Sequence, residues 1–439
     1  MTKIINGDSI KELKKFPDNY FHSVVTDPPY GLSFMGKKWD YDVPSVELWT
    51  EVFRVLKEGG YLLSFSGTRT QHRMAVNIED AGFEIRDMIA WVYGSGFPKS
   101  HNIGKAADKL QGNEREVIGK AKHQIGKYKE SEWASNTKAT GIFRNDKDKI
   151  CMETKGTSEW EGWGTALKPA LEPITMARKP FKTTVANNVL KNGVGGINID
   201  GCRVSFESKA DELSATPQGK VSYSSKTYAQ QQGLKKDLQN KRESNKQGRF
   251  PANFIHDGSD EVKDLFPYTK NGAINMTKHS AGKENIYNLG VKRSDKSIGG
   301  SRTVDSGSAS RFFYCAKASK QDRNEGLEDF EYKRKADRKI ADGKGGENPR
   351  NRTNTKKQNH HPTVKPTDLM RYLVRLVTPK EGIVLDCFMG SGSTGKACAL
   401  EGFEFVGIDL DKDYCEIAKA RIDKALEQKK QSDAQTKLF

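Results

Sequence analysis

Apolar and polar positions follow a regular pattern over the first 100 residues of this 439-residue chain. Short apolar runs predict strands at residues 3–5, 21–26, 61–65 and 83–93. Apolar side chains at helical spacing predict helices at residues 9–15, 46–57 and 70–81, the second of which is ended by Gly59 and Gly60. Strands that alternate with helices predict a parallel sheet covered on both faces.

The same alternation returns in residues 361–439. The pattern there predicts, in order, a helix, a strand, a helix, a strand and a closing helix at residues 369–377, 383–385, 393–400, 405–408 and 414–426. The tail beyond is expected to fray. The residues between the two regular ends are mostly polar, apart from a predicted strand and two short apolar pieces at residues 172–177, 250–255 and 311–315.

Charge separates the middle of the chain from its ends. The net charge is +16 overall, but it is −1 for residues 1–100, +4 for 101–180, +13 for 181–360 and 0 for 361–439. A basic segment between two neutral ones is typical of a region that follows a phosphate backbone. A disordered basic linker would have the same composition, so charge alone leaves both interpretations open.

Composition narrows the class of protein further. No apolar run approaches the roughly 20 residues of a membrane span, and the first residues lack the apolar core of a signal peptide, so we expect a soluble, cytoplasmic protein. The six cysteines contain no C-x-x-C pair, which argues against a zinc site and against a disulfide framework. We therefore expect no bound metal.

The first candidate for chemistry is Asp27-Pro28-Pro29-Tyr30, directly after a predicted strand. The prolines cannot continue the hydrogen bonding of the strand, and Pro28 restricts Asp27 to an extended conformation. The result is a stiff corner that presents one carboxylate, two carbonyl groups and one aromatic ring. Such a corner can accept hydrogen bonds from an amino group while Tyr30 stacks on the ring that carries it. An ordinary proline turn is the alternative.

The second candidate is the glycine-rich stretch from Gly390 to Gly395 (GSGSTG), which follows a predicted strand and opens a predicted helix. Asp409 lies 19 residues after its first glycine. This spacing is typical of a nucleotide-binding turn whose acid binds ribose hydroxyls, and by itself it also suits a nicotinamide-dependent dehydrogenase. After the helix that this turn opens, the pattern predicts only one strand, which ends at Asp409, and one helix, so the missing strands of the sheet must come from the amino-terminal end of the chain.

A sheet assembled from both ends places four acids at one edge. Asp8, Asp27, Asp386 and Asp409 each fall at the predicted carboxyl end of a strand, where open α/β sheets bind ligands. Two of them flank the glycine-rich turn, and one belongs to the proline corner. The pattern predicts a cofactor half-site beside an amino-group half-site.

Three stretches together resemble a known family. Asp27 to Tyr30, Leu385 to Gly392 (LDCFMGSG) and His361 to Pro366 (HPTVKP) are similar to motifs IV, I and X of the S-adenosylmethionine-dependent DNA amino-methyltransferases. Their order resembles the β class, whose catalytic domain is circularly permuted. Residues 195–201 also look like phage and prophage members of the family.

The resemblance implies a fold and a division of the chain. The fold is α/β, a Rossmann-like methyltransferase fold with a mixed, mostly parallel seven-stranded sheet whose antiparallel strand we place at residues 172–177. Residues 1–100 would carry the amino-group site and 361–439 the cofactor site of one catalytic domain. Residues 101–180 would be an insertion plus the returning strand, and 181–360 a basic target-recognition region.

The resemblance also implies roles for single residues. The catalytic corner would be Asp27, Pro28, Pro29 and Tyr30, with the Asp27 carboxylate and the Pro28 carbonyl accepting both amino hydrogens of a flipped base. The residues implied to bind S-adenosylmethionine are Asp8, Thr363, Lys365, Asp386, Phe388, Gly390, Gly392 and Asp409. Of these, Asp409 would hold the ribose, Asp8 the adenine amino group, and Thr363 and Lys365 the carboxylate end. Cys387 departs from the family, which usually has proline there.

The implied function is methyl transfer to the N6 atom of an adenine in double-stranded DNA, because an aspartate or asparagine at the first motif position generally accompanies adenine methylation in this family, and serine accompanies cytosine methylation. The alternatives are cytosine N4 methylation, a non-catalytic DNA-binding protein and a nicotinamide-type Rossmann enzyme. A cognate restriction enzyme and a homodimer are compatible with the resemblance. Aromatic residues would either line the base pocket or belong to the core; they are Phe34, Trp39 and those in the stretch from Trp91 to Phe97.

Overall fold

Two compact units make up the chain. The computed structural model describes residues 2–32, 40–96, 100–120, 152–215, 246–271, 305–316, 321–330 and 358–436. The first unit contains Met1–Gly94, Leu171–Phe330 and His361–Phe439, and the second contains Ser95–Ala170 and Glu331–His360. Because the first unit includes Leu171–Phe330, most of the basic middle belongs to the same unit as both ends of the chain.

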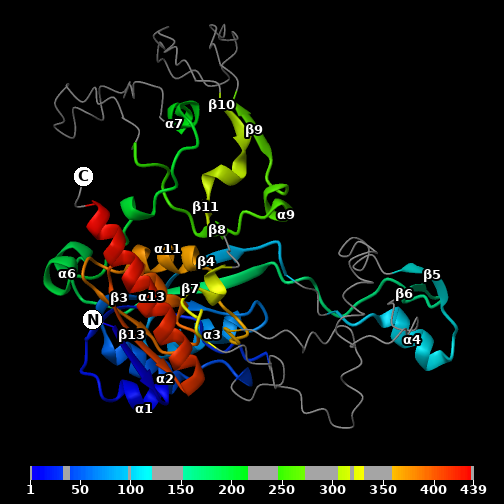
Figure 1. Ribbon diagram of the computed structural model, residues 1–439, viewed down its shortest axis with the longest axis horizontal. Coiled ribbons are helices and arrows are strands. Elements are labelled where there is room, and N and C mark those ends of the chain that lie inside the picture. The colour runs from blue at the N-terminus through cyan, green and yellow to red at the C-terminus, as the bar shows by residue number, and fades with distance from the viewer. Residues whose placement is uncertain are drawn as a thin grey trace, which may run out of the picture. The chain divides into compact units, whose positions relative to one another are not determined.

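A nine-stranded sheet forms the centre of the first unit (Figure 1). Its strands, in spatial order, are β1 (Thr2–Asn6), β13 (Glu404–Asp409), β12 (Ile383–Asp386), β2 (Phe21–Thr26), β3 (Leu56–Phe65), β7 (Leu171–Arg178), β4 (Glu84–Val92), β8 (Phe254–His256) and β11 (Tyr314–Cys315). Neighbouring strands are parallel, except that β7 is antiparallel to both β3 and β4. The prediction of a mostly parallel sheet assembled from both ends of the chain, with one antiparallel strand near residues 172–177, is confirmed.

The sheet has two strands more than the seven expected. β8 and β11 come from the basic middle of the chain and continue the sheet beyond β4. Ala90 of β4 donates a backbone hydrogen bond to the Asn253 carbonyl at 2.8 Å, and Ile255 is fully buried. The apolar pieces predicted near residues 250–255 and 311–315 therefore extend the central sheet.

Helices cover both faces of this sheet (Figure 1). One face carries α1 (Ser9–Leu13), α2 (Val46–Val55) and α3 (Gln71–Asp80), and the other carries α11 (Thr367–Val377), α12 (Ser393–Glu401) and α13 (Lys412–Thr436). Successive residues of β3 alternate between the two layers: Leu62 packs with the first set of helices and Leu63 with the second, and both are fully buried. Each face of the sheet thus has its own hydrophobic core.

Two predicted boundaries are wrong. Gly59 and Gly60 do not end a helix, because α2 stops at Val55 and both glycines lie inside β3. Gly59 has a φ of +85°, which glycine adopts at little cost, and it donates a hydrogen bond to the Lys179 carbonyl at 3.0 Å. The closing helix does not fray after residue 426 but continues to Thr436. Ion pairs at i,i+4 spacing, such as that between Lys429 and Asp433, support this extension.

The first unit also contains shorter elements from the middle of the chain. They are α6 (Val185–Asn192), η5 (Asp200–Cys202), α7 (Lys209–Ala215), α9 (Asp260–Lys263), β9 (Tyr268–Asn271), β10 (Asp305–Ser308), η6 (Ala309–Phe312) and α10 (Gln321–Asn324). β9 and β10 form an antiparallel hairpin. Asp211 is 1% exposed and accepts hydrogen bonds from Arg249 and Arg311, which ties α7 to this part of the chain.

The second unit contains α4 (Ile103–Gln111) and an antiparallel hairpin of β5 (Glu116–Lys120) and β6 (Met152–Lys155). Arg115 joins these elements through ion pairs with Asp108 and Glu161. Over the described ranges of both units, we find no helix with the length and hydropathy that crossing a bilayer requires.

Candidate active site

The proline corner follows β2 at the carboxyl edge of the sheet. Its backbone is held from two sides. The Asp40 carboxylate, which is 2% exposed, accepts hydrogen bonds from the backbone N–H groups of Tyr30 and Gly31 at 2.7 and 3.0 Å. On the other side the Thr70 hydroxyl donates to the Tyr30 carbonyl at 2.6 Å. These contacts hold the backbone of the corner at Tyr30 and Gly31.

The Asp27 carboxylate accepts hydrogen bonds on both of its oxygens. Oδ1 accepts from the Tyr30 hydroxyl at 2.7 Å, and Oδ2 accepts from the Lys365 ammonium at 2.7 Å. A second carboxylate, that of Glu172 at the start of β7, lies 3.2 Å from the Tyr30 hydroxyl and 3.1 Å from the Lys365 ammonium. Two acids, one ammonium and one phenol from three separate segments therefore form a single cluster.

The protonation states of the cluster follow from burial and charge. Burial lowers the pKa of Lys365, but the Asp27 and Glu172 carboxylates outweigh this effect and raise the pKa above its usual value. Burial, followed by the charges of the same two acids, raises the pKa of Tyr30 well above its usual value. Lys365 is therefore a cation and Tyr30 a neutral phenol at neutral pH, so both act as donors to Asp27.

The glycine-rich stretch forms the turn between β12 and α12. Gly390 and Gly392 have φ values of +52° and +77°, in the left-handed region that favours glycine. The Asp409 carboxylate, at the end of β13, accepts a hydrogen bond from the Gly390 N–H at 2.7 Å. A Cβ atom on Gly390 would lie 2.7 Å from Nε2 of His361, whose Nδ1 is 2.7 Å from the Thr363 carbonyl. The turn and the segment that carries Lys365 are thus in direct contact.

Asp386 connects the two half-sites. Its side chain is 2% exposed and accepts hydrogen bonds from the Thr26 hydroxyl at 2.7 Å, the Thr394 hydroxyl at 2.6 Å and the Phe388 N–H at 3.1 Å. Burial raises the pKa of Asp386 to about 6, although these three donors oppose the shift. Because Thr26 immediately precedes Asp27, one hydrogen bond links the proline corner to the glycine-rich turn.

The other predicted site residues lie along the same edge. Asp8 follows β1 and caps α1 by accepting a hydrogen bond from the Lys11 N–H at 3.1 Å. Its neighbour Ser9 donates to the Cys387 carbonyl at 2.6 Å, which brings the start of α1 to the glycine-rich turn. Phe388 is partly buried against the core. The four predicted acids, from β1, β2, β12 and β13, are thus found at one edge.

The Lys365 side chain lies at the proline corner. We expected it to bind the carboxylate end of the cofactor, but its ammonium contacts Asp27 and Glu172 at the proline corner. Of the predicted aromatic wall, Phe34, Trp39 and Phe97 lie outside the described residues. Trp91 is 4% exposed and belongs to the core.

Sequence reasoning missed the residues that support the motifs. Glu172 stands 142 residues from Tyr30 in the chain, and Asp40 and Thr70 belong to no recognised motif. The one signal for Glu172 was its charge at the head of an otherwise apolar strand. Next to it, burial and then the Glu172 carboxylate raise the pKa of Tyr93 to about 12.

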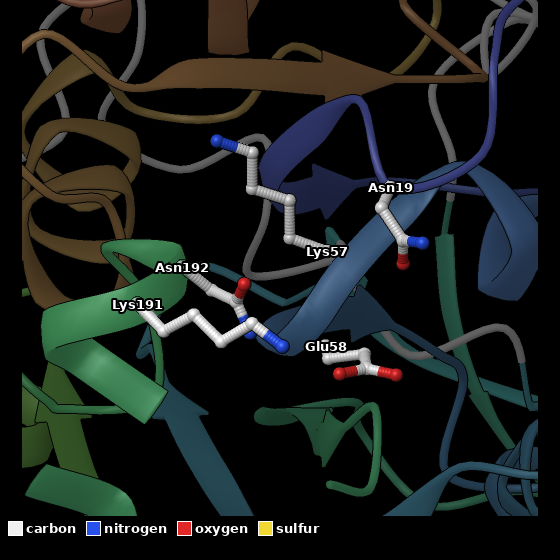
Figure 2. A pocket seen from close by; sticks show the side chains of 5 residues that line it. All are labelled: Asn19, Lys57, Glu58, Lys191 and Asn192. Atoms are coloured by element: carbon white, nitrogen blue, oxygen red, sulfur yellow. The ribbon is translucent and has the colours of Figure 1, made fainter. Parts of the chain in front are cut away.

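A separate pocket lies away from this edge (Figure 2). It is lined by Asn19, Lys57, Glu58, Lys191 and Asn192. Asn19 precedes β2, and Lys57 and Glu58 lie near the start of β3, so the pocket is at the amino ends of these strands. The glycine-rich turn and the proline corner lie at their carboxyl ends, and the pocket is therefore no part of the candidate site.

An open, mostly parallel sheet with a glycine-rich turn and a proline corner at one edge defines a protein of the Rossmann-like methyltransferase class. The family model described as DNA methylase matches residues 21–420, and the chain belongs to this family.

Individual relatives match the chain over parts of their length. The type II methyltransferase M.HindIII of Haemophilus influenzae is 28% identical over 239 residues, which are 44% of this chain and 64% of that protein. M2.LlaDCHI of Lactococcus lactis subsp. cremoris is 41% identical over 64 residues, 15% of this chain and 24% of that protein. The chain thus matches less than two thirds of the length of these relatives. The solved structure of PvuII DNA methyltransferase (cytosine-N4-specific) is 12% identical, with a TM-score of 0.38, over 97% of this chain and 93% of that one.

Proposed function

We propose that this protein transfers a methyl group from S-adenosylmethionine to the N6 atom of a flipped-out adenine in double-stranded DNA. The observation that carries the proposal is the hydrogen bond between Thr26 and Asp386, which joins an amino-group corner to a nucleotide-binding turn. Membership of the DNA methylase family supports it independently.

The residues of the glycine-rich turn suit an adenosyl ligand. The left-handed glycines leave the backbone uncovered, and a side chain on Gly390 would strike His361. Asp409 at the end of β13 retains lone pairs that can accept hydrogen bonds from ribose hydroxyls, since each carboxylate oxygen binds one backbone N–H. When bound, S-adenosylmethionine would supply an electrophilic methyl group. Asp386 stays buried beneath the turn and holds its shape.

The proline corner would bind the base. An adenine inside the duplex cannot reach the corner, so the base leaves the stack at a cost of a few kcal/mol. Tyr30 would then stack on the base, and the Asp27 carboxylate and the Pro28 carbonyl would accept its two amino hydrogens. These hydrogen bonds draw the nitrogen lone pair out of conjugation with the ring. The chain would therefore act by positioning and by charge-assisted hydrogen bonds.

The basic middle would contact the DNA. Residues 181–360 carry a net charge of +13, which suits binding to the phosphate backbone. The described part of this region includes β8 and β11, which extend the catalytic sheet itself. We therefore propose that residues 181–360 form the target-recognition region and that it is anchored to the sheet at β4.

A single residue favours adenine over cytosine as the target base. Asp27 stands at the first position of the motif, where the resemblance implies adenine, while the DNA methylase family also includes cytosine N4 enzymes. The test is to incubate DNA with the purified protein and labelled S-adenosylmethionine, and to identify the modified nucleoside by mass spectrometry. We expect N6-methyladenine. N4-methylcytosine would overturn the choice of base, and the absence of any methylated nucleoside would overturn the proposed activity.

A further inference from the structure

We propose that Glu172 is a positioning residue, which receives the Lys365 ammonium when the amino group of the target base binds Asp27. This inference rests on the function proposed above and deepens it. It assigns a role to a carboxylate that belongs to none of the three motifs.

The geometry allows the ammonium to change partners with little movement. Nζ of Lys365 lies 2.7 Å from Oδ2 of Asp27 and 3.1 Å from Oε2 of Glu172, so both acids are already within hydrogen-bonding distance. The third contact of the ammonium is the Tyr30 hydroxyl at 3.1 Å. A rotation within the lysine side chain is therefore enough to shift its main contact from Asp27 to Glu172.

The change of partner is required because two donors compete for one acid. The lysine ammonium and the amino group of a base both present N–H donors to the Asp27 carboxylate, whose other oxygen is bound by Tyr30. The ammonium is the stronger competitor because it is charged. A neutral amino group can replace it at Asp27 only if the ammonium has another anion to bind.

Burial makes this second anion necessary. The Lys365 side chain is 9% exposed, and a buried cation without a partner is strongly unfavourable. Glu172 provides the partner from a fixed place, because its strand pairs with β4 and places Glu172 opposite Trp91. After the shift, Lys365 and Glu172 form a neutral pair and the Asp27 carboxylate is open to the amino hydrogens of the base.

The test begins with Glu172→Gln, which keeps the size of the side chain and its contact with Tyr30 but removes the negative charge. Without that charge Lys365 stays on Asp27, and we expect kcat for DNA methylation to fall by at least about 10-fold. The dissociation constant for S-adenosylmethionine should change by less than about 2-fold. Glu79→Gln makes the same chemical change on an exposed turn of α3 and serves as the matched control.

A double-mutant cycle separates this role from a merely structural one. In a Lys365→Met background there is no ammonium to receive, so Glu172→Gln should then change kcat by less than about 2-fold. The effect of Glu172→Gln on the dissociation constant for substrate DNA is measured in the same two backgrounds. The test therefore still applies if the Lys365→Met variant has no methylation activity. Equal effects of Glu172→Gln in both backgrounds, or no effect in either, would overturn the inference. An inactive wild-type protein would overturn the proposed function itself.

Discussion

The Thr26 hydroxyl donates a 2.7 Å hydrogen bond to the Asp386 carboxylate across 360 positions of sequence, and both groups are buried. Thr26 is the last residue of β2 and Asp386 the last residue of β12, and these strands are neighbours in the sheet. The residue after Thr26 begins the proline corner, and the residues after Asp386 form the glycine-rich turn. This contact therefore sets the spacing between the two halves of the site.

Thr26→Val should destabilise the protein by about 1–3 kcal/mol, because it leaves the buried Asp386 carboxylate without one of its donors. Thr26→Ser keeps the hydroxyl and should cost less than about 1 kcal/mol. Urea unfolding at pH 7.5 measures both values. If valine and serine have equal effects, the hydrogen bond contributes nothing beyond packing.

Asp27→Ala should reduce methyl transfer by at least about 100-fold, since it removes the side-chain acceptor for the amino group. Affinity for S-adenosylmethionine should persist, because the glycine-rich turn is untouched. The rate is measured with labelled cofactor and the affinity by titration calorimetry. Asp80→Ala, on the exposed end of α3, is the matched control and should behave as wild type. Full activity of the Asp27→Ala variant would disprove the mechanism.

Gly390→Ala should weaken cofactor binding by at least about 10-fold, because its Cβ would lie 2.7 Å from Nε2 of His361 and its φ is +52°. Gly402→Ala is a control with the same backbone strain, at a φ of +83°, where the nearest atom is 3.9 Å away. Calorimetric titration should therefore separate the two variants. Equal affinities would show that the turn does not hold the cofactor.

Asp386 should make the stability of the protein fall as pH rises from about 4 to 6. Its pKa is raised by burial to about 6, whereas in the unfolded chain it is about 3.9, so the folded protein binds more protons in this window. The loss is on the order of 3 kcal/mol and is nearly complete about one pH unit above the folded pKa. Asp386→Asn should remove this component, which is measured as the difference between urea unfolding curves of the variant and the wild type at pH 4 to 7. A constant difference across that range would contradict the shift.

The carboxyl edge of the sheet could be predicted because its signals are local. Asp27 and Asp386 each follow a short apolar run, and prolines directly after Asp27 and a glycine four positions after Asp386 mark the end of the strand. Helices between such runs force parallel pairing, which brings the ends of the strands to one edge. The motif residues were therefore found without knowledge of any contact between them.

The cluster around Glu172 could not be predicted in the same way. Its contacts with Tyr30 and Lys365 depend on the pairing of β7 between β3 and β4, which no local pattern specifies. β8 and β11 were missed as sheet strands because three and two residues are too short to show a period. The error at Gly59 has a different cause, since a glycine that ends a helix and one inside an irregular strand look alike in sequence.

The position of β2 has a consequence for synthesis on the ribosome. β2 lies between β3, which follows it soon, and β12, whose first residue is Ile383. At 5–20 residues per second, roughly 20 to 70 s pass between the synthesis of these two strands. During that time Val24 and Val25 have an open strand edge beside them, so the nascent chain stays soluble only if aggregation is slow or a chaperone covers this edge until β12 has been made.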